Sequence, residues 1–583
     1  MERKRKTPTV IRKSANTRKK TIPFLIAVAN KVLNAIDFVD FINRAVTWDT
    51  EQCKVSPGHL AKAVILVTFF DIRAPLSRIS ETFQEIDTEF LFGQGILAED
   101  LNDYAIARTL DKIAAADMGP DTMFSTLCLV AYSVYEIAMK RLHSDTTSVS
   151  FYGDYRGEGE QEGENTDGTG ITDEEILQIV HGYNKDGRPE CKQVVVGKIV
   201  NEHGVPVAHS VMDGNTSDVE WNTKALDMVG DIFAKDLDEC IYIADSKLIN
   251  MNLFRTMMNP KKVIRFISRC PANFSEKLAA RATAQAYKDD DWVVLDPFSD
   301  RKNASEYQSQ EYRMTVDRRK VRCIVYKTSD GEKRFLRKKD NALDALQQDI
   351  KETEKKEFVC EADAVKEQQR FEKTHRRSVY TCTFRIEPVH TEKRPRGNPG
   401  KHPKPPIVVT KWYVHVDVAG ENPELMKQLQ YKEECIVLIT NVAADEFDMW
   451  DILNYYKNQS VVEIQFRLLK QPCIGSVIYL KTPQRIRALV MLLGIALLIR
   501  ALVQYKLRKG FEENTEELPP IGWNGGKLQP NLTLFFLKSA LVNHAFTREG
   551  RDEYSYSFSN PFDEQRIATL VRFLGLTVEE LIE

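Results

Sequence analysis

An aspartate inside an apolar strand is the feature that most restricts how this chain can fold. Residues 142–152 are rich in β-branched and aromatic side chains, which predicts a strand, and Asp145 lies within it. A lone carboxylate in an otherwise buried strand is costly unless it is paired or bound to a metal. Asp145 therefore needs a partner from elsewhere in the chain.

The segments that follow Asp145 predict a mixed sheet. Residues 193–200 and 205–211 form two apolar strands around a hairpin turn, and a helix at about 220–234 leads to a buried strand that ends on a second acid, Asp245. Another helix and a strand at 263–268 complete the series. A mixed sheet that brings Asp145 and Asp245 to adjacent strand ends is the arrangement of a ribonuclease-H-like core. We therefore expect an α/β protein with such a catalytic core.

A polar helix edge lies further along the chain. If residues 455–470 form one helix, five polar side chains fall within about 80° of one another at 100° per residue; they are Tyr456, Gln459, Glu463, Arg467 and Lys470. A carboxylate among cations suits a metal–phosphate site, because the acid can hold Mg²⁺ while the cations hold phosphate oxygens. A solvated helix face with a Glu–Arg pair is the alternative.

Changes in composition divide the chain into six regions. Residues 1–20 carry nine Lys and Arg against one acid, which predicts a basic arm. We expect a helical domain at 21–140, which suits a DNA-binding domain and a plain helical bundle equally well. We also expect the catalytic core at 141–274 and 432–510, a β-rich insertion at 275–431, and a C-terminal region at 511–583. Within the insertion, the charged stretch at about 341–372 predicts a helix. Residues 393–411 contain six Lys and Arg and no acid, which predicts an exposed basic loop.

Bulk properties exclude several classes of protein. The ten cysteines are scattered singly, which argues against a zinc site and a disulfide framework and is typical of a reducing cytoplasm. No signal peptide is apparent at the first residues. The apolar run at 488–499 is too short to span a bilayer and predicts a buried helix. We expect a cytoplasmic protein without a membrane partner.

The three acids Asp145, Asp245 and Glu463, in this order, resemble those of bacterial DDE transposases. The closest resemblance is to the insertion-sequence-four superfamily, in its sixteen-thirty-four-like branch, which carries a Tyr-x2-Arg-x3-Glu-x6-Lys signature. Tyr456, Glu463 and Lys470 match it at that spacing, whereas Gln459 stands in place of the Arg. The segments at 145–147, 182–189, 214–218, 244–246 and 438–441 also resemble this branch.

The resemblance implies a DNA transposase that binds the terminal inverted repeats of an insertion sequence and carries out cut-and-paste strand cleavage and strand transfer. Asp145, Asp245 and Glu463 would be the catalytic residues and would hold two Mg²⁺ ions, or Mn²⁺ in their place. Contacts to DNA phosphates would come from a further set: Tyr456, Gln459, Arg467, Lys470, Lys185 and Arg188. The partners would be double-stranded transposon ends and target DNA, bound by a homodimer, with the protein associated with the bacterial nucleoid.

Two other functions stay open from the sequence. A related metal-dependent nuclease would have the same acids but would cut DNA without joining it. A catalytically inactive relative would occupy the transposon ends as a repressor, which the departure at Gln459 allows. An acid/base hydrolase that uses two carboxylates gives no reason for the cations around Glu463.

Overall fold

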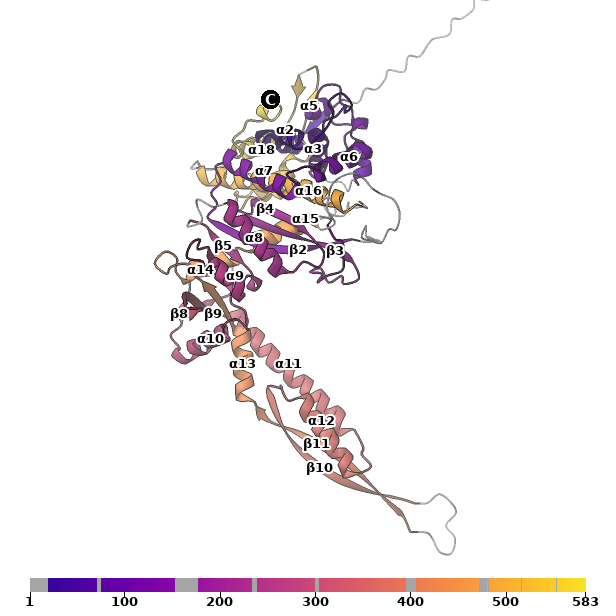
Figure 1. Cartoon of the computed structure of the whole chain (residues 1–583), viewed down its shortest axis with the longest axis vertical. Coiled ribbons are helices and arrows are strands. Elements are labelled where there is room, and N and C mark those ends of the chain that lie inside the picture. Colours follow the sequence, from indigo (N-terminus) through magenta and orange to yellow (C-terminus); the bar gives the residue numbers. More distant parts are fainter. Residues whose placement is uncertain are drawn as a thin grey trace, which may run out of the picture. The chain divides into compact units, whose positions relative to one another are not determined.

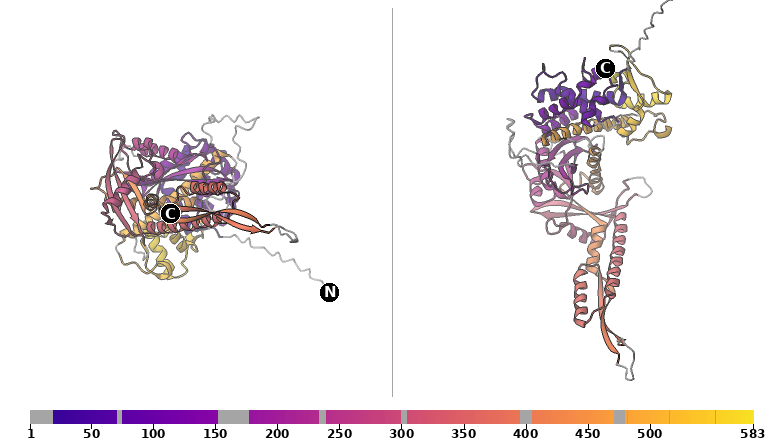
Figure 2. Two further views of the ribbon diagram at one scale, coloured as in Figure 1. Left: turned by 90° about the horizontal axis from the view of Figure 1, so that it is seen from below. Right: turned by 90° about the vertical axis from the view of Figure 1, so that its right-hand side faces the viewer.

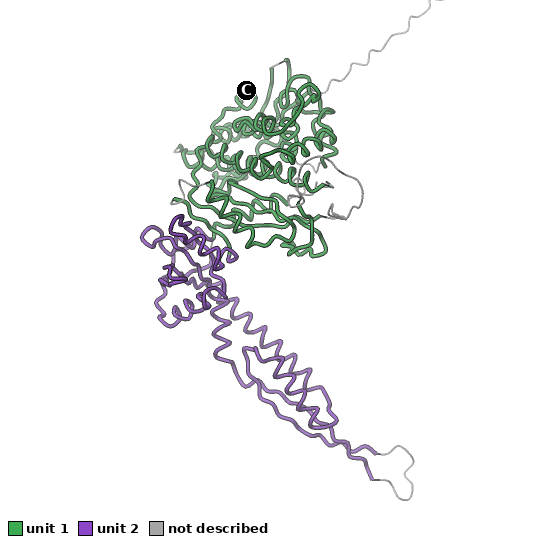
Figure 3. The backbone as a smooth tube through the Cα atoms, in the orientation of Figure 1, with its two compact units in different colours: residues 1–245, 457–583 green, residues 246–456 purple. Residues whose placement is uncertain are grey.

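The computed structural model describes residues 19–70, 75–151, 177–232, 239–298, 304–394, 405–470, 480, 482–514, 516–551 and 553–583. The chain divides into two compact units (Figure 3): residues 1–245 with 457–583, and residues 246–456. Both units combine strands with helices. The predicted mixed α/β class is therefore confirmed.

The first unit begins with the expected helices. Amphipathic or apolar segments form α1 (Phe24–Ala35), α2 (Phe38–Ala45), α3 (Pro57–Val67), α4 (Ile79–Thr82), α5 (Thr88–Phe92), α6 (Asp103–Ala114) and α7 (Pro120–Val134). Local sequence signals place their starts: Ser56 caps α3 by accepting a hydrogen bond from the His59 backbone N–H at 3.2 Å, and Pro57 occupies its first position. The only described strand in this part is the short β1 (Thr21–Pro23).

The long apolar helix α16 (Pro483–Glu513) forms the core around which these helices pack. It contacts α1, α3, α6 and α7, and Arg485 pairs with Asp111 of α6 at 2.6 Å. By length and composition α16 could cross a membrane, but 89% of its most apolar window is buried inside the protein. The helix is longer than the apolar run predicted from sequence, and its burial identifies it as a core helix.

The C-terminal region belongs to the same unit as the N-terminal helices. It forms α17 (Leu534–Leu541), β13 (Ala545–Arg548), β14 (Tyr554–Ser555) and α18 (Pro561–Phe573). Strand β13 pairs with β1, with Thr547 opposite Thr21, and α18 packs on α16. Figure 2 shows the first (indigo) and last (yellow) segments side by side.

The sheet of the first unit carries two of the acids. Its strands lie in the order β4-β3-β2-β5 and are β2 (Arg141–Phe151), β3 (Lys192–Asn201), β4 (Pro206–Met212) and β5 (Ile241–Ala244). Helix α8 (Asp218–Ile232) connects β4 to β5, and β5 runs parallel to β2, whereas β3 is antiparallel to both of its neighbours. Helix α15 (Ser460–Leu469) packs on β2 and β3.

The second unit contains another set of strands, in the order β6-β12-β9-β8-β7. They are β6 (Arg265–Arg269), β7 (Val293–Val294), β8 (Tyr307–Val316), β9 (Arg319–Thr328) and β12 (Cys435–Thr440). Its helices include α9 (Met251–Met257), α10 (Leu278–Asp289), α13 (Pro423–Glu434) and α14 (Met449–Lys457).

An elongated arm also belongs to the second unit. Helices α11 (Ser329–Glu354) and α12 (Glu361–Thr374) lie along the hairpin of β10 (Tyr380–Lys393) and β11 (Ile407–Glu421) (Figure 1). A small core that includes Leu346, Phe371 and Val414 joins them. The region predicted as a β-rich insertion therefore contains long helices as well as strands.

One helix predicted within the arm is wrong in its continuity. The charged segment at about 341–372 is divided between α11 and α12. The residues between the two helices turn toward the hairpin, because the backbone of Phe358 exchanges two hydrogen bonds with Trp412 of β11, each 2.9 Å long. The periodicity of charged residues did not reveal this bridge.

Two basic segments fall largely outside the described residues. Residues 1–18 of the basic arm and 395–404 of the basic loop are among these. At the described end of the basic arm, Lys19 pairs with Glu549 at 2.9 Å.

Candidate active site

Strand pairing places Asp145 beside Asp245. In the parallel pair of β2 and β5, Ser144 lies opposite Ala244, so the next residue on each strand is an aspartate. Burial raises the pKa of Asp145 most, and the negative charge of Asp245 adds to that rise. The adjacency predicted from the order of strands and helices is present in the structure.

Burial dominates the chemistry of Asp145. Only 26% of its side chain is exposed, and this desolvation raises the pKa of its carboxyl to about 6. Lys185 and the backbone N–H of Thr146 oppose the rise, and Thr146 donates to Asp145 Oδ1 at 2.7 Å. A nearby cation stabilises the charged form of such a carboxylate, largely withdrawn from water, more than it would stabilise an exposed one.

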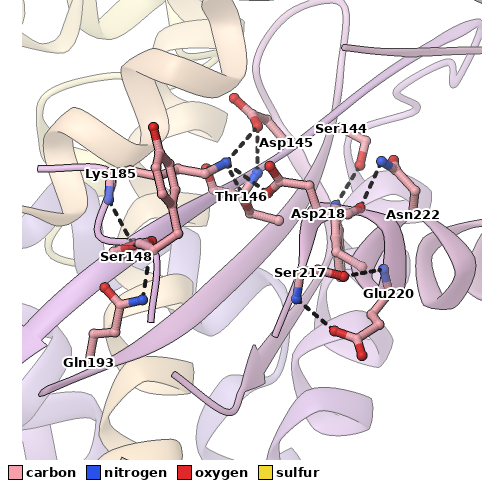
Figure 4. A network of polar contacts seen from close by, with 12 residues as sticks. Ser144, Asp145, Thr146, Ser148, Lys185, Gln193, Ser217, Asp218, Glu220 and Asn222 are labelled. Atoms are coloured by element: carbon pink, nitrogen blue, oxygen red, sulfur yellow. Dashed lines mark hydrogen bonds and ion pairs between the residues drawn. The ribbon is translucent and has the colours of Figure 1, made fainter. Parts of the chain in front are cut away.

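Lys185 is that cation in this structure (Figure 4). Its Nζ lies 2.9 Å from Asp218 Oδ1 and 3.6 Å from Asp145 Oδ1. It also donates to Thr146 Oγ1 at 2.5 Å and to the Thr146 carbonyl at 3.1 Å. Burial alone would lower the pKa of Lys185, but Asp145 and Asp218 raise it above its usual value.

The loop that carries Lys185 is held by polar side chains of β2 and β3 and by one of its own asparagines. The Asn184 amide donates to Ser150 Oγ and Gln193 Oε1, both at 2.9 Å, while its oxygen accepts from the backbone N–H of Asp186 at 2.9 Å. The Lys185 N–H donates to Ser148 Oγ at 3.2 Å. The segment at 182–189 therefore forms an ordered loop over β2 and β3, with its lysine directed at Asp145.

Two glycines allow this loop to meet the turn before α8. A Cβ at Gly182 would overlap the carbonyl oxygen of Gly214, and a Cβ at Gly214 would overlap the carbonyl oxygens of Gln193 and Val180. The Gln193 side chain joins the two segments by donating to the carbonyls of Gly214 at 2.6 Å and Tyr183 at 3.2 Å. Close backbone approach explains glycine at both positions.

Asp218 is a site residue that sequence reasoning missed. It begins α8 and accepts a hydrogen bond from the Thr146 hydroxyl at 2.5 Å, in addition to its pair with Lys185. Reciprocal capping fixes the turn, since the Ser217 N–H donates to Glu220 Oε2 at 2.6 Å and the Glu220 N–H donates to Ser217 Oγ at 3.2 Å. In the sequence, Asp218 ends the segment at 214–218, where an acid is equally typical of a turn or a helix cap.

Helix α15 presents Glu463 on its open face. Val462 and Phe466 pack against Val200 of β3, and the buried Gln465 donates to the Gly204 carbonyl at 2.9 Å. Glu463 and Arg467 are exposed. The C-terminal end of the helix meets the Lys185 loop, because Lys470 pairs with Asp186 at 2.6 Å. Glu463 and Arg467 thus lie together on the exposed side of α15, as the 100° periodicity predicts.

The prediction of one continuous helix at 455–470 is wrong. Helix α14 ends at Lys457 and α15 begins at Ser460. At the break, the N–H groups of Val461 and Val462 bond to carbonyls three residues back, and the Asn458 amide donates to the Glu202 carbonyl at 2.9 Å. This side-chain contact and the tighter turn interrupt the helix.

The break changes where two residues of the predicted polar edge lie. Tyr456 is part of α14 and of the second unit, and Gln459 is the residue before the first turn of α15. Glu463, Arg467 and Lys470 remain together on and just after α15. Arg188 lies on the same loop as Lys185, and the backbone N–H of Arg188 donates to Asn184 Oδ1 at 3.2 Å.

The acids fit a hard divalent cation by their chemistry. Asp145 and Asp245 offer carboxylate oxygens, the ligands that Mg²⁺ prefers, at neighbouring strand positions. Among the residues that the structure describes, no group of three His, Cys, Asp or Glu side chains is gathered closely enough to hold a metal. Glu463 would therefore have to join the aspartates for a three-carboxylate site to form.

Comparison with known families adds to this geometry. Residues 166–499, more than half of the chain, match the family described as "Transposase DDE domain". The chain belongs to this DDE transposase family. The matched region of the transposase contains Asp245 and Glu463, whereas Asp145 precedes it. Residues 17–129 match a second family, described as "Domain of unknown function (DUF4277)".

Other comparisons are weaker. A solved structure titled as a piggyBac transposase synaptic complex with hairpin DNA is similar at 9% identity and a TM-score of 0.36, covering 95% of this chain and 84% of that chain. No curated protein matches the sequence.

Proposed function

We propose that this DDE transposase cuts the ends of an insertion sequence and joins them to target DNA in a cut-and-paste reaction, with Asp145, Asp245 and Glu463 as its catalytic acids. The observation that carries the proposal is the parallel register of β2 and β5, which sets Asp145 beside Asp245. Helix α15, with Glu463 on its open face, packs on the same strand β2. This order of strands and a following helix supports the proposal of a ribonuclease-H-like catalytic core.

The three carboxylates would hold two Mg²⁺ ions, or Mn²⁺ ions, which supply a Lewis acid and an activated water or 3′-hydroxyl when bound. The protein's own part is to hold the scissile phosphate beside these carboxylates. No side-chain nucleophile is required, because the attacking oxygen comes from water or DNA.

Nearby cations would hold DNA phosphates. Lys185 and Arg188 lie on the loop over β2 and β3, and Arg467 and Lys470 lie at the other end of α15 from its break. Lys470 and Lys185 pair with acids in this structure, so binding of a phosphate would exchange one anionic partner for another. The phosphate roles of Tyr456 and Gln459 rest on the resemblance of the signature alone.

The proposal extends to partners and location. The substrates are double-stranded transposon ends with terminal inverted repeats and a target duplex, bound by a homodimer. The protein would act on bacterial DNA in the cytoplasm, associated with the nucleoid.

Cleavage of the natural flanking DNA tests the function. The purified full-length protein is incubated with labelled duplexes from both flanks of its own gene, with and without Mg²⁺, and the products are sized and scored for joining to a target plasmid. We expect Mg²⁺-dependent nicks at one fixed position in each flank, followed by joined products. Nicks without joined products would identify the related nuclease, and end binding without nicks would identify the inactive repressor.

Three variants test the acids in the same assay. Asp145→Asn, Asp245→Asn and Glu463→Gln should each reduce cleavage by at least about 1,000-fold while end binding stays near wild type, because affinity comes mostly from phosphate contacts. The matched control is Asp227→Asn, which changes an exposed aspartate on α8 and should cleave normally. Wild-type cleavage by any of the three acid variants would remove that acid from the site.

A further inference from the structure

The strongest unexplained feature of the site is the position of one cation among its acids. Lys185 is the only Lys or Arg that an ion pair joins to Asp145 among the described residues, and its ammonium is also bound to Asp218 and to both oxygens of Thr146. Its side chain is 28% exposed, so the cation is largely withdrawn from water. A phosphate-binding lysine that waits for DNA would be expected to extend into solvent, where it keeps its hydration and its rotamer freedom.

We propose that Lys185 is the internal counter-ion of Asp145 in the metal-free protein, that Asp218 and Thr146 hold it there, and that a divalent cation must displace it from Asp145. The inference rests on the proposed function of the acids as metal ligands. It assigns Asp218 as a positioning residue, since Asp218 touches the ammonium and the Thr146 hydroxyl.

The geometry indicates that a metal would displace Lys185 from Asp145 without driving the lysine out of the site. Lys185 lies closer to Asp218, at 2.9 Å, than to Asp145, at 3.6 Å. A cation that binds Asp145 can therefore break the longer contact while Asp218 and Thr146 keep the ammonium nearby. The same lysine would then remain at hand for a DNA phosphate, which is a good acceptor for an ammonium group.

The arrangement has a consequence for metal affinity. Removing the positive charge of Lys185 leaves Asp145 without its counter-ion and removes a repulsion toward an incoming divalent cation. The free protein should bind metal more tightly without this lysine than with it. Metal and DNA would thus be coupled, because a phosphate that draws the ammonium away from Asp145 also favours metal binding, and the coupling is reciprocal.

Binding of Mn²⁺ to the DNA-free protein tests the proposal without any turnover. Free Mn²⁺ is measured by electron paramagnetic resonance during titration of the full-length wild type, Lys185→Met and Lys185→Arg. We expect Lys185→Met to bind Mn²⁺ about tenfold more tightly than wild type or better, because a unit charge within 4 Å of the ligand is removed. Lys185→Arg keeps the charge and should stay within about twofold of wild type.

A matched control separates a specific counter-ion from a general effect of charge. Lys470→Met removes the same charge from a lysine that pairs with Asp186, on the loop beside Lys185. Its Mn²⁺ affinity should change less than about twofold, since the pair that it breaks does not include Asp145. Equal tightening in Lys185→Met and Lys470→Met would overturn the proposal, as would unchanged affinity in Lys185→Met.

Two further arrangements keep the outcome readable. Lys185→Gln serves as a second neutral variant if Lys185→Met does not fold, which melting followed by circular dichroism reports. Failure of the proposed function would appear separately, as absent cleavage of the flanking DNA by wild type, because the Mn²⁺ titration contains no DNA.

Discussion

Replacing Gly214 by alanine should disturb the active site indirectly, through the turn that ends at Asp218. A Cβ at this position overlaps two backbone carbonyl oxygens, those of Gln193 and Val180, which belong to a bridge between β3 and the residues just before the Lys185 loop. Neither oxygen can swing aside as the end of a side chain could. Gly214 also donates its N–H to the Gln178 carbonyl at 3.0 Å and accepts from Gln193 Nε2 at 2.6 Å, so a shift of the backbone weakens both bonds.

The expected size follows from these contacts. Overpacking of a tightly packed position costs about 1–3 kcal/mol, and each weakened buried hydrogen bond adds up to about 1 kcal/mol. We therefore expect the free energy of unfolding of the first unit to fall by about 3 kcal/mol. Because the turn ends at Asp218, which holds Lys185, DNA cleavage should fall as well, by at least about tenfold.

Urea unfolding followed by circular dichroism, together with the flanking-DNA cleavage assay, measures both effects. Gly550→Ala is the matched control, since a Cβ there meets only the flexible side chain of Glu553 and the φ of Gly550 lies outside the left-handed region. It should change the unfolding free energy by less than about 0.5 kcal/mol. A Gly214→Ala protein with wild-type stability and cleavage would refute the reasoning that this close approach builds the site.

Three other predictions concern charge. Deleting residues 1–20 should weaken DNA binding and flatten its dependence on salt by about 0.9 units of log–log slope for each DNA phosphate that the arm neutralises in the full-length protein; an unchanged slope would make the arm a solubilising tail. Arg467→Ala should raise the activation free energy of single-turnover cleavage by about 1.5–3 kcal/mol, because Arg467 stands exposed one turn beyond Glu463. Gln459→Arg should change the cleavage rate little. A large gain in rate from Gln459→Arg together with an unchanged rate in Arg467→Ala would reverse this assignment. Burial lowers the pKa of His209 to about 3, so below pH 6.5 only the unfolded chain takes up a proton at this residue. The unfolding free energy should then fall by about 1.4 kcal/mol per pH unit from His209 alone. Urea unfolding of His209→Gln at pH 7 and pH 5 should show a smaller loss than wild type.

The sequence predicted the strands of the site because their signals are local. β-branched residues around Asp145 and the short apolar run before Asp245 mark β2 and β5, and a helix between strands favours parallel neighbours. The adjacency of the two aspartates follows from that topology. The role of Asp218 did not follow, because its partners Thr146 and Lys185 are far away in the chain and only the folded register brings them together.

Helical periodicity misled where a polar side chain competes with the helix. The 100° pattern continues across Asn458 and Gln459, so the sequence alone favoured one helix, whereas the contact of Asn458 with the Glu202 carbonyl interrupts it. The charged helix predicted at about 341–372 is divided for a related reason, a long-range backbone pairing at Phe358. In both places a tertiary contact overrides local propensity.

The most direct test of the central claim is to locate a metal in the complex with DNA. Crystals of the protein with an end duplex and Mn²⁺ would show the ion by anomalous diffraction. We predict anomalous density in contact with the carboxylate of Asp145, with Asp245 and Glu463 completing the ligands at about 2.0–2.2 Å, as expected for a small divalent ion with oxygen ligands. Density that does not touch Asp145, or a Glu463 carboxylate more than about 10 Å from it, would contradict the account, since one metal pair could not bridge them.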